Sequence, residues 1–169
     1  MSSFPLSQKY IDFINTTDVS AEFLEGTTAS GKTTVGAGVK FMRMVSQSKK
    51  KIHAIAAKTT GKAEETIIQQ DNGILDLHRN AVYCGNGDKD YKLSHIKFEG
   101  KIIYILGYSS RDKWEMVLGA QFGCVYIDEI NTADIEFIRE MSTRNDYMLA
   151  TLNPDDPSLP VYKEFVNRS

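Results

Sequence analysis

The stretch Gly26-Thr27-Thr28-Ala29-Ser30-Gly31-Lys32-Thr33 matches the pattern G-x-x-x-x-G-K-[ST] at every fixed position. The preceding residues, Ala21–Glu25 (AEFLE), have the composition of a short strand. The following residues, Gly31–Val45, suit a helix because apolar side chains recur at helical spacing. A glycine-rich turn between a strand and a helix is the context in which this pattern binds phosphate, so we expect a phosphate-binding loop here.

The residue types of this loop fit the binding of a nucleoside triphosphate. Glycines let the backbone curl so that successive N–H groups point at phosphate oxygens, and the helix directs its positive end there. Lys32 would reach the β- and γ-phosphates, and the hydroxyl of Thr33 would bind Mg²⁺. The expected ATP-binding residues are Gly26, Thr27, Thr28, Ala29, Ser30, Gly31, Lys32, Thr33 and Thr34. The alternative is a surface turn that matches the pattern by chance.

A second group of candidates follows an apolar run later in the chain. Cys124–Ile127 leads directly into Asp128-Glu129, which is typical of a buried parallel strand that ends in two carboxylates. We expect Asp128 to hold Mg²⁺ and Glu129 to orient or deprotonate an attacking water. The alternative is an acidic pair that only opens the next helix.

Thr151-Leu152-Asn153-Pro154 closes the next apolar strand. A threonine and an asparagine at such a strand end could sense the γ-phosphate and pass its loss to a moving element. Asn-Pro also ends strands on its own account. The residues alone favour neither interpretation.

The remaining pattern alternates strands with helices and predicts an α/β fold. Together with the phosphate loop it indicates a P-loop NTPase of the RecA/ASCE-like type, with three layers and a mostly parallel central sheet covered by helices on both faces. The expected strands, besides those above, are 51–57, 81–84, 147–152 and a hairpin of 96–98 with 102–106. The expected helices are 6–14, 62–70, 112–118 and 132–141, the last capped by Asn131 or Thr132.

Composition narrows the class of protein further. The chain has 169 residues, 41% hydrophobic and 25% charged, with a net charge of −2, so it is not evidently a nucleic-acid binder. No apolar run approaches a membrane span, and we expect a soluble intracellular protein without membrane contact. The two cysteines lack the paired spacing of a zinc site, and the three histidines fit no metal-ligand spacing.

The phosphate loop, the stretch Lys113–Ile130 and the stretch Ala150–Phe165 together resemble the ATPase domain of bacteriophage terminase large subunits. The resemblance implies Mg²⁺-dependent ATP hydrolysis that drives double-stranded DNA into a viral procapsid. It also implies a homo-oligomeric ring, a capsid portal and a terminase small subunit as partners, in the cytoplasm of the infected bacterial host. Thr151 and Asn153 fall in the family's coupling motif. We expect residues 1–169 to be one ATPase domain, truncated before the family's nuclease domain.

Two further site residues depend on this resemblance. In this family a glutamine in a helix before the phosphate loop binds the edge of adenine, and the resemblance makes Gln8 the candidate. The alternative is that Gln8 is an exposed helix residue. Many terminases carry an arginine within the phosphate loop, and this chain has none there. Arg111, Arg139 and Arg144 could supply the catalytic cation, from the same chain or a neighbour. We expect Arg111, although each of these is individually typical of a solvated surface residue.

Two other functions remain open at the level of sequence. A helicase-like P-loop ATPase would share the phosphate loop and the acidic pair, but would need a second RecA-like domain. A nucleotide-binding module that never hydrolyses ATP would have little use for the complete set of Lys32, Thr33, Asp128 and Glu129.

Overall fold

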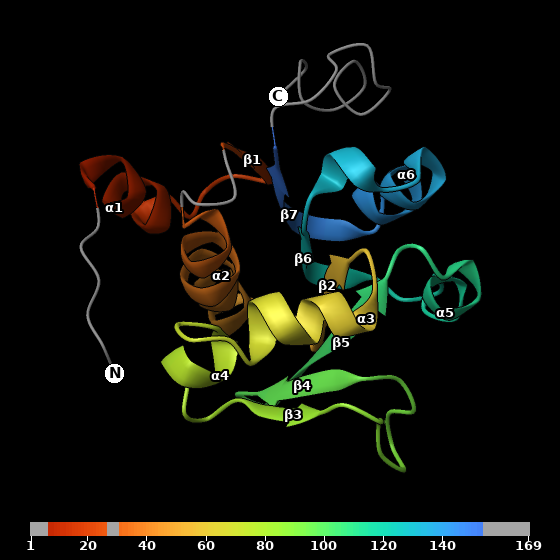
Figure 1. The fold of residues 1–169 in the computed structure, drawn as a ribbon. Coiled ribbons are helices and arrows are strands. Elements are labelled where there is room, and N and C mark those ends of the chain that lie inside the picture. Colours follow the sequence, from red (N-terminus) through yellow and green to blue (C-terminus); the bar gives the residue numbers. More distant parts are fainter. Residues whose placement is uncertain (1–6, 27–30, 154–169) are drawn as a thin grey trace.

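The computed structural model describes residues 7–26 and 31–153, whose centre is a single mixed sheet (Figure 1). Within these ranges seven strands lie in the order β1-β7-β6-β2-β5-β4-β3. Their bounds are β1 Ala21–Glu25, β2 Ile52–Ala57, β3 Val82–Cys84, β4 His95–Phe98, β5 Lys101–Gly107, β6 Phe122–Ile127 and β7 Asn145–Leu152. All pairs from β1 to β5 in this order are parallel, whereas β4 and β3 add antiparallel pairs at one edge.

Helices cover both faces of the sheet. The helical segments are α1 Gln8–Asn15, η2 Thr34–Phe41, α2 Met42–Gln47, α3 Thr60–Ala63, η3 Glu64–Ile68, α4 Ile74–Leu77, α5 Arg111–Glu115, η4 Ile130–Thr132 and α6 Ile135–Ser142. The segments η2 and η3 are π-helical and η4 is a 3₁₀ turn. Across the described ranges, no helix combines the length and the apolar character needed to cross a bilayer.

The alternation of strand side chains divides the core into two layers. On one face, Ile55 and Tyr126 pack with Phe41 and other residues of η2, α2, η3 and α4. On the opposite face, Ala54, Ala56, Val125 and Ile127 pack with Trp114 of α5 and with Phe137, Ile138 and Met141 of α6. The predicted α/β fold, with a mostly parallel sheet and helices on both faces, is therefore confirmed.

Local differences from the predicted elements have identifiable causes. The helix expected at 132–141 begins later, at Ile135, and the proposed caps Asn131 and Thr132 lie in the 3₁₀ turn instead. Asp134 is the cap, because its carboxylate accepts a 2.8 Å hydrogen bond from the N–H of Glu136. The hairpin between β4 and β5 is confirmed, with Glu99 and Gly100 both at positive φ. The short helix α4 was not predicted.

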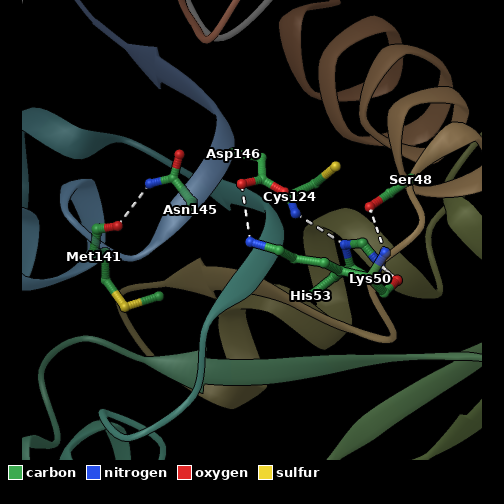
Figure 2. A network of polar contacts seen from close by, with 7 residues as sticks. All are labelled: Ser48, Lys50, His53, Cys124, Met141, Asn145 and Asp146. Carbon is green, nitrogen blue, oxygen red and sulfur yellow. Dashed lines mark hydrogen bonds and ion pairs between the residues drawn. The ribbon is translucent and has the colours of Figure 1, made fainter.

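A polar network joins the starts of the central strands (Figure 2), buried at His53 and Cys124, half-buried at Lys50 and exposed at Asp146. His53 of β2 accepts a hydrogen bond from the N–H of Cys124 at Nδ1 (2.9 Å), so its Nε2–H donates to the carbonyl of Lys50 (2.9 Å). The ammonium of Lys50 lies 2.9 Å from a carboxylate oxygen of Asp146. These contacts fix β2 to β6 and to the start of β7 at the edge opposite the predicted site.

Candidate functional site

Most of the predicted site residues that the structure describes converge at the carboxyl ends of three strands. Gly26, Asp128 and Asn153 directly follow β1, β6 and β7, and these strands are parallel neighbours in the sheet. A cavity of about 440 Å³ lies at this edge. Its lining residues are Gly31, Lys32, Thr33, Thr34, Lys62, Thr66, Gln70, Asp71, Asp128, Glu129, Thr151 and Asn153.

Lys32 is held at the sheet edge by oxygen atoms from two strand ends. Its side chain is buried, and Nζ donates to the carbonyl of Leu152 (2.9 Å), to Oδ1 of Asn153 (2.7 Å) and to the carbonyl of Gly26. Burial lowers the pKa of Lys32, while the nearby carboxylates of Asp128, Glu129 and Glu25 partly offset this effect. The result is a desolvated ammonium that faces the cavity and can exchange its carbonyl partners for a ligand's oxygens.

Gly31 fits the backbone that presents Lys32. Its φ is +77°, in the left-handed region that glycine adopts without steric cost, and its carbonyl accepts the N–H of Val35 at 3.1 Å. The expected phosphate-binding residues Thr27, Thr28, Ala29 and Ser30 lie outside the described residues.

Asp128 is a buried carboxylate with defined donors. Its Oδ1 accepts hydrogen bonds from the hydroxyls of Tyr126 (2.9 Å) and Thr151 (3.1 Å). Burial raises the pKa of Asp128, and the two hydroxyl donors oppose that rise by stabilising the ionised form. Lys32 acts in the same direction as these donors. The arrangement favours a carboxylate that can balance a cation in the cavity.

The backbone turns sharply at Glu129. Its φ of +48° and ψ of +55° are left-handed, an uncommon conformation for a residue with a side chain. The N–H of Glu129 donates to Oγ1 of Thr151 (3.1 Å). The carbonyl of Glu129 lies 3.2 Å from the hydroxyl of Tyr108 and 2.9 Å from that of Thr132, and these two hydroxyls share a 2.6 Å hydrogen bond, so one of them donates to the carbonyl. These bonds hold the turn from both sides, and they direct the glutamate side chain to the cavity rather than into a regular helix.

Thr151 and Asn153 contact the same group of residues. The Thr151 hydroxyl donates to Asp128 and accepts from Glu129, so one side chain fixes both members of the acidic pair. Oδ1 of Asn153 accepts a hydrogen bond from the ammonium of Lys32, and the backbone N–H of Asn153 donates to Oδ1 of Asn131 (3.4 Å). The segment expected to couple a reaction to movement is thus bonded to the lysine and to the loop after the acidic pair.

Part of the cavity lining comes from residues that were not among the sequence candidates. Lys62 and Thr66 lie on consecutive turns of the α3–η3 segment, and Gln70 and Asp71 follow it. The sequence places these polar residues within the expected helix 62–70 or directly after it. The sequence pattern does not show which face of that helix turns toward the phosphate loop.

Two candidates lie away from this cavity. Gln8 is exposed on α1, where its Nε2 donates to a carboxylate oxygen of Asp12 at 2.8 Å. Arg111 forms ion pairs with Glu115 (2.6 Å) and Glu136 (2.8 Å), and it lines a separate cavity of about 350 Å³ together with Tyr108 and Thr132. The roles expected for Gln8 and Arg111 therefore stay predictions.

The fold and site define an α/β protein in which a buried lysine and an acidic pair meet at the carboxyl edge of a mostly parallel sheet. Residues 23–168 match the family described as terminase large subunit, T4likevirus-type, N-terminal. The chain belongs to this family, as the resemblance of its motifs predicted. No protein with a curated description matches the chain.

Solved structures of the large terminase from a thermophilic bacteriophage share the fold. One crystal form has a TM-score of 0.75 at 18% sequence identity, covering 98% of this chain and 43% of the other. The complexes of that terminase with ATP-γ-S and with ADP have TM-scores of 0.74 and 0.75, at 17% and 18% identity, each covering 97% of this chain and 42% of the other. The chain thus spans about two-fifths of the length of these terminases.

Proposed function

We propose that this chain binds Mg²⁺-ATP in the 440 Å³ cavity and hydrolyses it to drive double-stranded DNA into a viral procapsid. The observation that carries the proposal is the convergence of Lys32, which follows β1, with Asp128 and Glu129, which follow β6, on one cavity. Membership of the terminase family and the likeness to a terminase that was solved with ATP-γ-S and ADP support it.

Phosphate binding would use groups that already face the cavity. Among the described residues, the ammonium of Lys32 donates to carbonyl and amide oxygens, which a triphosphate oxygen can replace with a full negative charge. The backbone at Gly31 and the start of the helical segment beyond it supply N–H groups at the same place. The remaining loop residues, Gly26 to Ser30, would complete this binding loop.

The residues present also fit a magnesium ion. Hydroxyl and carboxylate oxygens are ligands that Mg²⁺ accepts, and Thr33 and Asp128 both line the cavity. When bound, the ion would neutralise charge on the phosphates. Tyr126 and Thr151 would hold the carboxylate of Asp128 in place without competing for its other oxygen.

Glu129 would orient the attacking water and accept its proton. It lines the cavity beside Asp128, and its backbone is fixed by Thr151 on one side and by Tyr108 and Thr132 on the other. A base whose backbone is fixed in this way loses little freedom when water binds, and such positioning is a main contribution that a protein makes to phosphoryl transfer.

Coupling would begin at the bond between Lys32 and Asn153. The ammonium has to leave Oδ1 of Asn153 when it binds the γ-phosphate, and it can return after the phosphate departs. Asn153 would then move between two partners during each cycle, and the segment after it would transmit that change.

The remaining expectations of the proposal come from the family. They are a homo-oligomeric ring that binds double-stranded DNA, docking on the capsid portal with the terminase small subunit, and action in the cytoplasm of the infected host. Gln8 would contact adenine, and Arg111 would supply the cation that the phosphate loop lacks.

Two substitutions test the proposal against a matched control. Lys32→Ala should abolish Mg²⁺-ATP binding in titration calorimetry. Glu129→Gln should keep the affinity and lower turnover by about 100-fold or more. Lys49→Ala removes an exposed lysine and should change neither quantity. Unchanged ATP affinity in Lys32→Ala would exclude the site, and normal turnover in Glu129→Gln would exclude Glu129 as the base.

A further inference from the structure

The antiparallel hairpin at the edge of the sheet gathers a cysteine, an aspartate and a histidine. Cys84, the last residue of β3, lies opposite His95, the first residue of β4, and Asp88 lies in the connecting loop. One ligand atom from each residue, a thiol sulfur, a carboxylate oxygen and an imidazole nitrogen, can be chosen so that all lie within 4.8 Å of one another. This cluster is separate from the residues that line the 440 Å³ cavity.

His95 directs a nitrogen without a hydrogen-bond partner into this cluster. Its side chain is fully buried, and Nδ1 lies 2.8 Å from the carbonyl of Leu93, so Nδ1 carries the proton and Nε2 presents a lone pair. Among the described residues, Nε2 has no hydrogen-bond partner. The nearest carboxylate oxygen, Oδ2 of Asp88, is 3.5 Å away, too far for a good hydrogen bond.

The loop fixes the carboxylate of Asp88 beside this nitrogen. Its Oδ1 accepts the N–H groups of Tyr91 (2.8 Å) and Asp90 (3.0 Å), which leaves Oδ2 to face His95 and the ammonium of Lys97 (2.6 Å). Gly87 has a φ of +73°, and a Cβ there would lie 2.1 Å from the carbonyl oxygen of Lys92. The turn therefore accepts only glycine at this position and holds Asp88 in one place.

We propose that Cys84, Asp88 and His95 bind a zinc ion, with water as the fourth ligand. Zinc takes sulfur, imidazole and carboxylate ligands in a tetrahedron, and bonds of about 2.0–2.1 Å place neighbouring nitrogen and oxygen ligands roughly 3.4 Å apart. The observed separation of Nε2 and Oδ2 is 3.5 Å. The hydrogen bond from Nδ1 to a backbone carbonyl is the usual outer contact of a zinc-bound histidine.

The ligand types distinguish this site from the proposed magnesium site. A thiolate and an imidazole are poor ligands for Mg²⁺ and Ca²⁺ and good ligands for Zn²⁺. Sequence spacing did not indicate the cluster, because each ligand lies in a different element: Cys84 at the end of β3, Asp88 in the loop and His95 at the start of β4. Cross-strand register, rather than a C-x-x-C repeat, brings Cys84 and His95 together. The ion would tie down β3, a short edge strand whose only paired neighbour in the described sheet is β4.

Metal titration of the full chain, kept reduced with a phosphine, tests the proposal. We expect one equivalent of Zn²⁺ per chain, with a rise in Tm of about 5–10 °C at 100 times the Kd. Co²⁺ should bind at the same stoichiometry and show a thiolate charge-transfer band together with the visible bands of a tetrahedral ion. Absence of saturable Zn²⁺ binding, or a Co²⁺ spectrum without a thiolate band, would overturn the assignment.

Matched variants locate the ion. Cys84→Ser and Asp88→Asn should each weaken Zn²⁺ binding by about 10-fold or more. Cys124→Ala removes the other cysteine, which is buried in β6, and should bind as the unchanged chain does. Lys97→Gln should bind more tightly, since it removes the cation that competes for Oδ2 of Asp88. Equal loss in both cysteine variants, or unchanged binding in Cys84→Ser, would place any zinc elsewhere.

Discussion

Thr151 determines how the acidic pair is presented, through a single hydroxyl group. That hydroxyl donates to Asp128 and accepts from the N–H of Glu129, both at 3.1 Å, and the residue is buried. In Thr151→Val the carboxylate and the N–H both lose a partner, so the free energy of unfolding should fall by about 1–3 kcal/mol. Chemical denaturation measures the change, and Thr151→Ser, which keeps the hydroxyl, is the control.

The same pair of variants reports on the proposed reaction. Turnover in Thr151→Val should fall further than ATP affinity, because Thr151 positions Glu129 and does not itself hold phosphate in this proposal. Steady-state kinetics and calorimetry at a temperature where both variants are folded separate the two effects. Equal activity of the valine and serine variants would show that the hydroxyl does not position the acidic pair.

His53 makes the stability of the protein sensitive to acid. Burial lowers the pKa of His53 to about 4, and Lys101 lowers it further, while the hydrogen bond to the Lys50 carbonyl and the charge of Asp146 oppose the shift. Between about pH 6.5 and pH 4 the unfolded chain binds more protons at this residue, so the contribution of His53 is complete above pH 6.5 and declines toward pH 4.

Urea unfolding at pH 7 and pH 5 measures this contribution. The unchanged chain should lose about 1–2 kcal/mol more than His53→Gln over that interval, because glutamine does not titrate. Protonation would also remove the hydrogen bond from the N–H of Cys124 to Nδ1, seen in Figure 2. Parallel pH profiles of the two proteins would show that His53 keeps an ordinary pKa in the folded state.

At the scale of elements, a buried lysine forms hydrogen bonds that connect the end of α1 to the rest of the fold. Lys40 of η2 is fully buried, lies 2.9 Å from Glu22 of β1, and donates to the carbonyls of Phe13 and Thr16 at the end of α1. Lys40→Met would leave Glu22 and both carbonyls without the ammonium, at a cost of about 3–5 kcal/mol.

Hydrogen exchange can show whether that loss is local. Amides of α1 should exchange faster in Lys40→Met, whereas those of β2 and β6 in the middle of the sheet should change far less. The double variant Lys40→Met, Glu22→Gln removes the carboxylate charge that has lost its cation and should recover part of the stability. Unchanged exchange in α1 would mean that its apolar contacts alone hold it.

Strands were predicted well from their apolar residues, whereas a helix boundary was predicted poorly where several residues could each cap the helix. Short apolar runs, only partly alternating, sufficed to predict the strands of the parallel part of the sheet, because strands covered by helices on both faces are apolar along most of their length. The predicted start of α6 was wrong because Asn131, Thr132 and Asp134 are all good helix caps. Only tertiary contacts select Asp134. The four-residue helix α4 is too short to show a period.

That several candidate site residues lie close together was predictable for a different reason, and only in part. Lys32, Asp128 and Glu129 follow strands of one parallel sheet, and the carboxyl ends of such strands necessarily meet at one edge. The left-handed turn at Glu129 has no signal in the sequence, because it is imposed by bonds to Thr151, Tyr108 and Thr132. The wall formed by Lys62 and its neighbours depends on how a helix is rotated above the sheet.

At the scale of the whole molecule, two cavities share the backbone of Glu129. Tyr108 and Thr132 line the smaller cavity, and their paired hydroxyls contact the carbonyl of Glu129, whose side chain lines the larger one. Arg111 lies in the smaller cavity, exposed and paired with Glu115 and Glu136. In the proposed ring, we expect this arginine to act on a neighbouring chain, because it is exposed outside its own chain's larger cavity.

Mixing two inactive variants tests whether Arg111 acts within its own chain or on a neighbouring chain. If Arg111 acts on a neighbouring chain, Lys32→Ala and Arg111→Ala should each have low turnover alone, and an equal mixture should recover activity. In a randomly mixed ring about a quarter of the interfaces would join an intact site to an intact arginine, which sets the expected recovery. Turnover per chain should also rise with protein concentration, and Glu129→Gln should abolish it throughout. A mixture as inactive as its components, together with concentration-independent turnover of the unchanged chain, would place the whole catalytic set within one chain.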